Sequence, residues 1–456
     1  MEPFRLQYDR GTIIVTGGEP TLRAELPGVM FDPRTETERA EARYYRAIVE
    51  LFVARKLAFT DEARLYDRFP CTLQTSRQPY PHQEQAVHTW WQQKGRGVVV
   101  LPTGTGKTFT AMLAIVKCGR PTFVVTPTID LLHQWAWELS QAFGIPIGQL
   151  GGGTHDLQPI TVSTYDSAYI YVEQWGNRYG LLIFDECHHL PGPTCQMAAL
   201  AAIAPYRLGL TATPERSDGG EELYYPLIGP IVYRREIQEL SGDFLARYDT
   251  QRRYVELTEE EAEQYQNARD EYRNFLTSHR IQMNGTDGWR RFILESSRSP
   301  EGRSAMLAYR EQKRIERESS AKLACLQELL QQHARDQMII FTADNATVYR
   351  ISRLFFVPAI THQTKSAERK QILERFHQGI YNTVVTSQVL NEGVDVPNAN
   401  IGIVLSGSGT IRENVQRLGR LLRKQGTKQS ILYEIVVRGT SEEWISQRRR
   451  QHQAFE

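Results

Sequence analysis

Short apolar runs, separated by stretches of helical length, recur through most of this 456-residue chain. The runs are rich in Val, Ile and Phe, as expected for strands that are buried on both faces of a parallel sheet. The first group is GVVVLPTG, PTFVVTPT, PITVSTYD, LLIFDECHH and RLGLTATP, and the second is MIIFTAD, NTVVTSQ, IGIVLSG and SILYEIVV. The sequence therefore predicts two α/β units, at roughly 79–232 and 325–445.

The rest of the chain does not show this alternation of short apolar runs and helical stretches. Residues 1–75 combine a strand-like run, RGTIIVTGG, with an amphipathic helical pattern over 44–59, which indicates a small α+β module. Residues 257–330 are rich in Glu, Gln, Arg and Tyr, and Thr258 with Glu261 fits a capping box at a helix start. A solvated helical linker and an inserted helical subdomain both fit this second segment.

The amino-acid composition and net charge indicate the class of protein and its cellular location. Hydrophobic residues make up 41% and charged residues 23%, which is typical of a globular chain, and 54 Lys+Arg against 53 Asp+Glu give a net charge of +1. This balance argues against coating nucleic acid by bulk charge but allows a local basic groove. The five cysteines form no CxxC pair, so we expect reduced thiols without disulfide partners. Without a secretory signal or an apolar run of about 18 residues, the expected location is cytoplasmic, with no membrane partner.

The sharpest local signal is LPTGTGKT at 101–108, directly after the strand-like run GVVV. A strand, a Gly-rich turn and a helix start let backbone N–H groups wrap a phosphate chain. Lys107 would then reach the β- and γ-phosphates, and the Thr108 hydroxyl would bind Mg²⁺. Leu101 stands where the usual pattern has Gly. The predicted nucleotide-binding loop residues are Gly104, Thr105, Gly106, Lys107 and Thr108.

A pair of carboxylates follows another apolar run about eighty residues later. Leu181–Phe184 predicts a buried strand, which would deliver Asp185 and Glu186 to the edge where ligands bind in such sheets. We expect Asp185 to hold Mg²⁺ and Glu186 to orient and deprotonate the attacking water. Alone the pair would suggest only a helix cap, but together with the phosphate loop it indicates nucleotide hydrolysis.

Two histidines come next in the chain. His188 and His189 are poor metal candidates, because no other ligands are spaced around them. We expect His189 to couple the nucleotide state to the turn at Thr211 and Thr213.

The second α/β unit ends with a basic segment, QRLGRLLR at 416–423. Arg420 and Arg423 would share one helix face, from which they could reach a γ-phosphate as arginine fingers do. A solvated basic helix is the alternative. Gly419 favours the functional interpretation, because glycine weakens a helix and suggests that another surface approaches closely.

Taken in order, these segments resemble the motifs of superfamily 2 helicases and translocases. The motifs are PHQEQA (81–86), LPTGTGKT (101–108), VVTPTIDLLHQW (124–135), VSTYDSA (162–168), DECHH (185–189), LTATPER (210–216), IIFT (339–342), SQVLNEGVDVPNAN (387–400) and QRLGRLLR (416–423). The last two are most similar to the XPB-type DNA helicases, particularly the compact archaeal ones.

The resemblance implies two RecA-like domains in tandem, at 79–232 and 323–456. It also implies an N-terminal α+β domain at 1–75 resembling a damage-recognition domain, a linker at 233–256 and a helical thumb-like insert at 257–322.

Roles for individual residues also follow from the resemblance. Gln83 would read adenine, and Gln416, Arg420 and Arg423 would act in hydrolysis beside Gly393 and Asp395, which would lie at the nucleotide. Contacts to one strand's backbone are implied for Pro127, Thr128, Thr164, Thr342, Ser387 and Gln388. Strand opening is implied for Arg216 and Asp218, although Ser217 between them replaces the family's Glu.

The function implied is an ATP- and Mg²⁺-dependent DNA helicase or double-stranded DNA translocase with 3′–5′ polarity. It would act in DNA repair, such as nucleotide excision repair, or in promoter opening, with a nuclease or repair-protein partner. Three alternatives stay open: an ATP-gated DNA clamp that recruits a nuclease, an RNA helicase, and the motor subunit of a restriction enzyme. An RNA helicase usually carries Asp-Glu-Ala-Asp where this chain has Asp-Glu-Cys-His.

Overall fold

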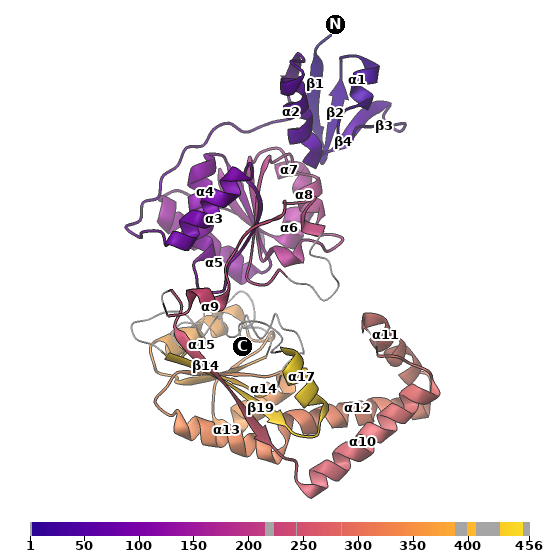
Figure 1. Ribbon diagram of the computed structural model, residues 1–456, viewed down its shortest axis with the longest axis vertical. Helices are drawn as coiled ribbons and strands as arrows, with labels where there is room; N and C mark the ends of the chain where they lie inside the picture. The colour runs from indigo at the N-terminus through magenta and orange to yellow at the C-terminus, as the bar shows by residue number, and fades with distance from the viewer. Residues whose placement is uncertain are drawn as a thin grey trace. The chain divides into compact units, whose positions relative to one another are not determined.

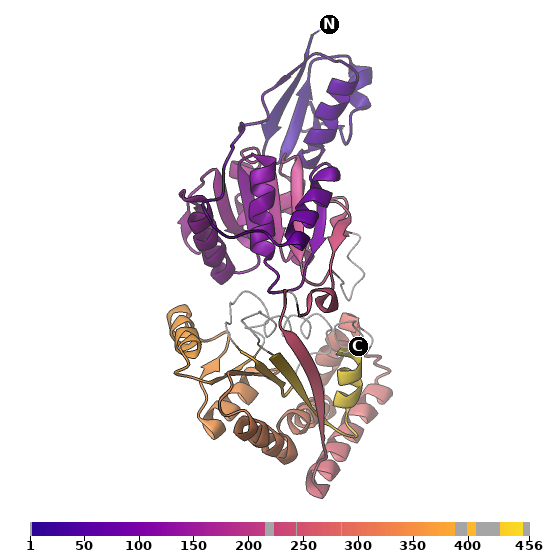
Figure 2. The ribbon, with the colours of Figure 1, turned by 60° about the vertical axis from the view of Figure 1, so that its left-hand side comes forward.

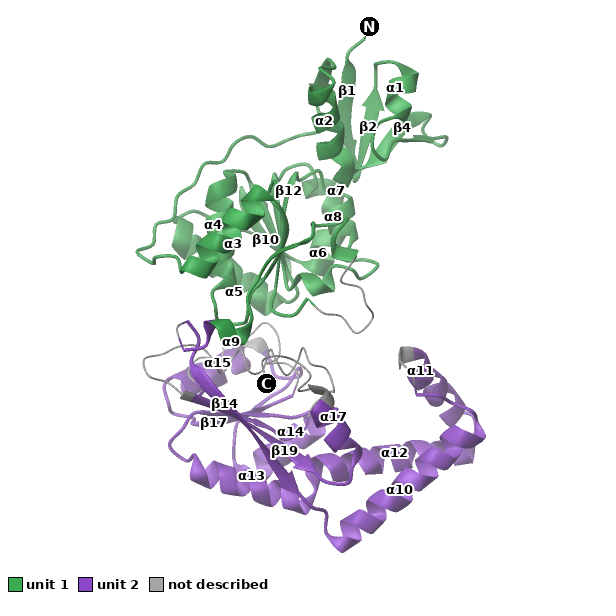
Figure 3. Ribbon diagram, viewed as in Figure 1, with its two compact units in different colours: residues 1–239 green, residues 240–456 purple. Residues whose placement is uncertain are grey.

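Two compact units, residues 1–239 and 240–456, make up the computed structural model (Figure 3). The structure describes residues 2–214, 223–242, 244–283, 285–387, 399–406 and 429–449. Each unit contains a largely or wholly parallel sheet with helices on its faces, so the predicted α/β class is confirmed (Figure 1). None of the described helices is long and apolar enough to cross a membrane. All five cysteines are free thiols.

The first unit begins with a small mixed domain. Its elements are β1 (Phe4–Asp9), β2 (Thr12–Thr16), α1 (Pro20–Ala24), β3 (Met30–Asp32), β4 (Thr37–Glu41), the 3₁₀ helix η1 (Ala42–Tyr44), α2 (Tyr45–Ala54) and β5 (Phe59–Asp61). The strand order is β3-β4-β2-β1-β5, with only β1 and β5 parallel. Leu6, Ile13 and Val15 point inward from the sheet, and Ile48 and Phe52 of α2 pack with them in one core. The domain is therefore the α+β module that the sequence predicted.

The larger part of the first unit is an eight-stranded sheet with the order β13-β6-β12-β11-β7-β10-β8-β9. Its strands are β6 (Arg96–Val100), β7 (Thr122–Thr126), β8 (Gly148–Gly151), β9 (Thr154–His155), β10 (Ile160–Thr164), β11 (Leu181–Asp185), β12 (Tyr206–Thr211) and β13 (Ile231–Arg234). Its helices are α3 (Pro81–Gln92), α4 (Lys107–Cys118), α5 (Ile129–Phe143), α6 (Tyr165–Ile170), α7 (Val172–Trp175), the 3₁₀ helix η2 (Cys187–His189) and α8 (Met197–Leu200). All neighbouring strands are parallel except β8 and β9.

Helices cover both faces of this sheet (Figures 1 and 2). One core contains Trp90 of α3, Phe109 of α4 and Trp135 of α5, and the other contains Tyr165 of α6 and Trp175 of α7. Burial on both faces explains why the central strands read as unbroken apolar runs. The carboxyl ends of β6, β11 and β12 consequently meet at one edge of the sheet.

The second unit has a six-stranded parallel sheet with the order β14-β19-β18-β15-β17-β16. Its strands are β14 (Arg247–Val255), β15 (Met338–Phe341), β16 (Ala359–Ile360), β17 (Thr383–Thr386), β18 (Ile401–Val404) and β19 (Gln429–Val437). Its helices are α10 (Glu259–Ser278), α11 (Gly285–Ser296), α12 (Pro300–Glu318), α13 (Ser320–Gln332), α14 (Asn345–Phe355), α15 (Ser366–His377) and α17 (Ser441–Arg449), and the short α9 (Ile237–Leu240) joins the two units. The four apolar runs predicted for the second sheet are strands β15, β17, β18 and β19.

The segment predicted as a linker, 233–256, is not one throughout. Residues 247–255 form β14, which pairs with β19 along its whole length and lies at the edge of the second sheet. The sequence RYDTQRRYV has no apolar run, because an edge strand leaves much of its surface to solvent. The linker interpretation is therefore wrong for these residues.

The predicted helical insert consists of α10, α11 and α12, and α10 lies against α12 (Figure 1). The capping box is present: Thr258 Oγ1 accepts the Glu261 N–H at 3.2 Å, and Glu261 Oε2 accepts the Thr258 N–H at 3.3 Å. Phe275 and Phe292 are buried in a small core of the insert with Tyr272 packed against them. These aromatic side chains pack mainly with one another, which is how a helical hairpin of low hydrophobicity acquires a core.

Candidate functional site

The predicted phosphate loop lies between β6 and α4, at the carboxyl edge of the first sheet. Gly104 and Gly106 have φ of +88° and +85°, in the left-handed region that favours glycine. A Cβ on Gly106 would lie 2.4 Å from Gln83 Nε2, so the turn has no room for a side chain there. Thr105 Oγ1 donates to the Pro102 carbonyl at 2.7 Å and closes the turn. The loop thus delivers the start of α4, with Lys107 and Thr108, to the strand edge.

Lys107 faces Glu186, one of the two carboxylates at this edge. Its Nζ lies 3.4 Å from Glu186 Oε1, and it is buried without a hydrogen-bond acceptor among the described residues. Glu186 directly follows β11 with φ of +46°, a strained backbone conformation for a residue with a side chain. The Thr211 hydroxyl, at the end of β12, donates to Glu186 Oε2 at 3.4 Å. Three strand ends therefore bring an amine, a carboxylate and a hydroxyl together.

Asp185, the last residue of β11, is held by two aromatic side chains. Its Oδ2 accepts the Trp135 indole N–H at 2.8 Å, and its Oδ1 accepts the Glu186 N–H at 3.1 Å. The Tyr165 hydroxyl donates to its backbone carbonyl at 3.0 Å. Burial, and next the charge of Glu186, raise the pKa of Asp185, while Lys107 and the Trp135 bond lower it. A buried carboxylate of this kind gains most from a nearby cation.

These residues fit a phosphate chain with its magnesium ion. The buried Lys107 amine lacks an acceptor that a phosphate oxygen would supply, and the glycine turn leaves the start of α4 open to an anion. Thr108 and Asp185 are the oxygen donors that would hold Mg²⁺. Among the described residues no group of three or more His, Cys, Asp or Glu side chains is placed to bind a metal, so the phosphate would have to complete the coordination.

The turn after β12 is contacted by His188. Its Nδ1 lies 3.1 Å from Thr211 Oγ1 and 3.5 Å from Glu186 Oε2, and Thr211 Oγ1 in turn accepts the Thr213 N–H at 3.2 Å. The sequence had favoured His189 for this contact, whose ring lies 4.4 Å from that of His188. His188 thus contacts the turn in this structure, and the coupling role of His189 stays a prediction.

The Gln83 side chain also makes contacts that the sequence did not predict. Its Nε2 donates to the carbonyls of Thr105 at 2.9 Å and Gly106 at 3.3 Å, and its Oε1 accepts the Tyr80 N–H at 2.9 Å. The His82 ring lies 3.1 Å from the same Thr105 carbonyl. In this structure the Gln83 amide therefore supports the phosphate loop, and reading adenine would require these bonds to break.

The residues predicted to contact a nucleic-acid backbone lie at strand ends, as expected. Thr128 follows β7 and Thr164 is the last residue of β10. Their hydroxyls cap α5 and α6 by accepting the N–H groups of Leu131 and Ser167 at 3.3 and 3.2 Å. Pro127 precedes Thr128 in the same turn.

In the second unit, Thr342 follows β15 and donates to the Asp344 carbonyl at 3.0 Å. Ser387 follows β17 and donates to Asn345 Oδ1 at 2.9 Å. The hydroxyls of these predicted contact residues are thus engaged within the protein, where they shape the turns.

Several predicted residues fall outside the described part of the chain. They are Arg216, Asp218, Gln388, Gly393, Asp395, Gln416, Arg420 and Arg423.

Sequence reasoning missed the two residues that position Asp185. Trp135 closes the motif VVTPTIDLLHQW and Tyr165 lies within VSTYDSA, and both are almost fully buried. An aromatic residue with a polar tip that is buried in a sheet protein usually finds a hydrogen-bond partner. That rule was the available signal, although it does not say which partner.

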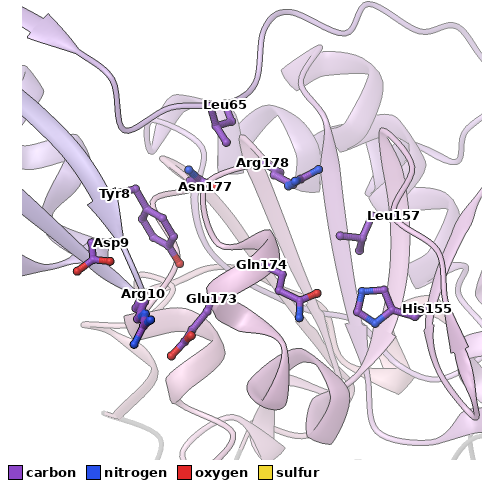
Figure 4. Close-up of a pocket in the computed structure, with 10 residues that line it drawn as sticks. All are labelled: Tyr8, Asp9, Arg10, Leu65, His155, Leu157, Glu173, Gln174, Asn177 and Arg178. Atoms are coloured by element: carbon purple, nitrogen blue, oxygen red, sulfur yellow. The ribbon is translucent and has the colours of Figure 1, made fainter.

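A pocket of about 600 Å³ opens elsewhere in the first unit, between the N-terminal domain and the larger sheet (Figure 4). Asp9 and Arg10 line it from the β1–β2 turn, and Glu173 and Arg178 line it from α7 and the following turn. None of the predicted site residues lines this pocket.

Comparison with known proteins decides the family. The DNA 3′-5′ translocase XPB2 of Sulfurisphaera tokodaii is 40% identical over 447 residues, which cover 98% of this chain and 99% of that protein. The chain belongs to the XPB helicase family. Three family descriptions match it in succession: Xeroderma pigmentosum group B helicase damage recognition domain at residues 6–63, Type III restriction enzyme, res subunit at 76–216, and ERCC3/RAD25/XPB C-terminal helicase at 306–454.

Other XPB proteins are more distant and longer. The DNA 3′-5′ helicase XPB of Mycobacterium tuberculosis is 29% identical over 81% of this chain and 62% of that protein. The TFIIH helicase/translocase subunit XPB of Antonospora locustae is 27% identical over 78% of this chain and 50% of that protein.

Solved structures support the fold. The Pyrococcus furiosus Hef helicase domain matches 81% of this chain and 98% of that structure, with a TM-score of 0.53 and 19% identity. Yeast Dbp5 bound to RNA and ADP BeF3 matches 82% of this chain and 88% of that structure, with a TM-score of 0.56 and 13% identity. The XPB-type chain therefore shares its sheet architecture with helicases that have little sequence in common with it.

Proposed function

We propose that this XPB-family chain is a motor that hydrolyses ATP and moves on DNA with 3′–5′ polarity. The observation that carries the proposal is the grouping of Lys107, Asp185 and Glu186 at the carboxyl edge of the first sheet, beside a glycine turn. The relatives named as DNA translocases and helicases supply the substrate and the direction. They favour DNA over the RNA alternative.

The chemistry follows from the positions of the side chains. Lys107 would leave Glu186 for the phosphates when ATP binds, because a phosphate chain carries more negative charge than one carboxylate. Glu186 would then be free to accept the proton of the water that attacks the γ-phosphorus, as the bond from that phosphorus to the ADP oxygen breaks. Mg²⁺ held by Thr108 and Asp185 would neutralise charge on the phosphate oxygens.

We propose that the second unit contributes Gln416, Arg420 and Arg423 to the hydrolytic step, with Gly393 and Asp395 beside the nucleotide. Guanidinium groups stabilise the charge that develops on the transferred phosphoryl group. The turns that follow Thr128, Thr164, Thr342 and Ser387 would bind backbone phosphates of DNA through backbone N–H groups, since the hydroxyls of these four residues are engaged within the protein. Binding of this kind tolerates any sequence.

We further propose that Arg216 and Asp218 act in strand opening, and that a repair protein or nuclease is the partner in the cell, where the protein would associate with the nucleoid. The Type III restriction description covers only the segment of the phosphate loop and the carboxylate pair. Cleavage of DNA would therefore belong to another chain.

The experiment that tests the function compares ATP hydrolysis with duplex DNA, single-stranded DNA and RNA of equal length. We expect DNA to stimulate turnover and RNA to have little effect. Equal or greater stimulation by RNA would refute the assignment of DNA as the track.

A further inference from the structure

Four arginines gather where the N-terminal domain meets the larger sheet of the first unit. Arg43 and Arg46 come from η1 and α2, and Arg96 and Arg207 come from the starts of β6 and β12, where they are direct neighbours in the parallel register. Like charges placed opposite each other on neighbouring strands destabilise a sheet. Burial lowers the pKa of Arg207, and the charges of Arg96 and Arg43 lower it further. The cluster therefore needs compensation from its surroundings.

Two of the arginines, Arg207 and Arg46, have hydrogen-bond acceptors among the described residues. Arg207 is fully buried and donates to the carbonyls of Ala204, Leu227 and Ala202 at 3.2, 2.6 and 2.9 Å.

The two arginines of the N-terminal domain have carboxylate partners. Arg46 pairs with Glu50 at 2.8 Å and also donates to the carbonyls of Lys94 and Pro205 at 2.8 and 2.9 Å. Arg43 Nε lies 2.6 Å from Glu41 Oε2, but it is buried and the pair is not aligned as a hydrogen bond.

Arg96 is different. Its Nε and Nη2 are buried, and neither has a hydrogen-bond acceptor among the described residues. Two carboxylates, Glu41 and Glu50, thus face four guanidinium groups in this part of the chain, which leaves an excess of two positive charges. Buried N–H groups of a guanidinium are rarely left without an acceptor.

We propose that Arg96 and Arg43 bind an oxyanion of the phosphate class at this junction. Inorganic phosphate carries a charge of about −1.5 to −2, which matches the excess, whereas a phosphodiester carries about −1 and offsets half of it. The oxygens of either group accept the paired N–H groups of a guanidinium. The side chains of Arg43 and Arg46 remain 22% and 17% exposed, so the cluster reaches solvent from the side of the N-terminal domain. The ligand would join the two domains of the first unit, because Arg43 belongs to one and Arg96 to the other.

Two sources of this chemistry are distinguishable: free phosphate and a phosphodiester of the DNA backbone. The Arg46 guanidinium lies 5.5 Å from the Tyr206 ring, which stacks on Trp91, and Lys117 lies 5.7 Å from the Trp91 ring. This arginine cluster does not include the residues proposed to hydrolyse ATP. Only the possibility that the ligand is a DNA phosphodiester rests on the proposed function.

The test uses the full chain carrying Lys107→Ala, so that phosphate bound at the glycine loop does not contribute. Thermal unfolding is followed while inorganic phosphate replaces chloride at constant ionic strength. A ligand that binds only the folded state raises the unfolding temperature with its concentration. We expect such a rise in the parent, a loss of phosphate affinity of about tenfold or more in Arg96→Gln and in the more exposed Arg43→Gln, and no loss in the control Arg5→Gln.

A second measurement separates the sources. Binding of a short duplex DNA is measured at several salt concentrations for the parent and Arg96→Gln. If the ligand is a DNA phosphodiester, Arg96→Gln lowers by about one the slope of the logarithm of the DNA-binding constant against the logarithm of the salt concentration. If this slope is unchanged but phosphate no longer raises the unfolding temperature of the variant, the ligand is free phosphate. The proposal is refuted if phosphate does not raise the unfolding temperature of the parent, or raises it equally in both arginine variants.

Discussion

Trp135→Phe is the substitution that tests most sharply how Asp185 is held. The indole N–H of Trp135 donates to Asp185 Oδ2 at 2.8 Å in the buried space beside α5. Phenylalanine keeps most of the ring packing but removes the donor. A hydrogen bond to a charged group contributes about 1.5–3 kcal/mol. The ionised form of Asp185 loses this amount, and the protonated form loses less.

Loss of the Trp135 hydrogen bond also changes the pKa of Asp185 in a defined direction. Burial already raises the pKa of Asp185, and the Trp135 bond is one of the interactions that lower it. Removing the bond raises the pKa further, by on the order of one unit since about 1.4 kcal/mol corresponds to one unit. Ionised Asp185 is needed to hold Mg²⁺, so we expect the acid limb of the ATPase pH profile to move to higher pH. The Mg²⁺ concentration for half-maximal turnover at neutral pH should rise about tenfold.

Trp175→Phe provides a matched control in the same domain. Trp175 is also fully buried, and its indole N–H donates to the Ala168 carbonyl at 2.9 Å, on the other face of the sheet. The control should lose about 1 kcal/mol of stability without changing the Mg²⁺ or pH dependence of turnover. Equal shifts in both variants, or none in Trp135→Phe, would refute the reasoning, because the effect would then not pass through Asp185.

Two further predictions follow from the structure, and a third, for Arg420, follows from the sequence. Lys107→Ala should reduce ATP hydrolysis about 100-fold or more while DNA binding is retained. Arg420→Ala should bind nucleotide normally in a fluorescence titration yet hydrolyse it roughly 10³-fold more slowly, and normal turnover would contradict its role. In the insert, burial raises the pKa of Glu316, but Lys313 and the hydrogen-bond donors around the carboxylate outweigh burial and lower the pKa overall. The stability that ionised Glu316 contributes is therefore fully present above its unfolded pKa of 4.5, and it is lost as the pH falls through the lower pKa of the folded state. Chemical denaturation should show that Glu316→Gln is less stable than the wild-type chain at pH 7. The difference in the free energy of unfolding should become smaller in acid.

Much of the fold was predictable because burial leaves a direct trace in the sequence. Strands such as β11 are covered on both faces, so LLIF had to be apolar throughout, and Asp185 and Glu186 come directly at its end. The edge strand β14 leaves no such trace, since its solvent-facing residues are charged, and it was taken for a linker.

The residues of the site were predictable where the chemistry restricts the residue type. They were less predictable where a contact depends on the direction in which a side chain points. Glycines and Lys107 of the phosphate loop admit few substitutes, so the motif identified them. Which histidine of the pair faces Thr211 depends on the direction of side chains in a 3₁₀ turn, which no pattern of types records. The support of Asp185 by Trp135 joins residues fifty positions apart, and only the folded sheet brings them together.

The measurement that tests the central claim most directly is displacement of the third strand from a DNA triplex, which needs movement along a duplex but no separation of its strands. We expect the wild-type chain to displace the strand with ATP and Mg²⁺, and Glu186→Gln to bind the same DNA without displacing it. If the wild-type chain hydrolysed ATP on this DNA yet left the third strand in place, it would be a clamp and not a motor.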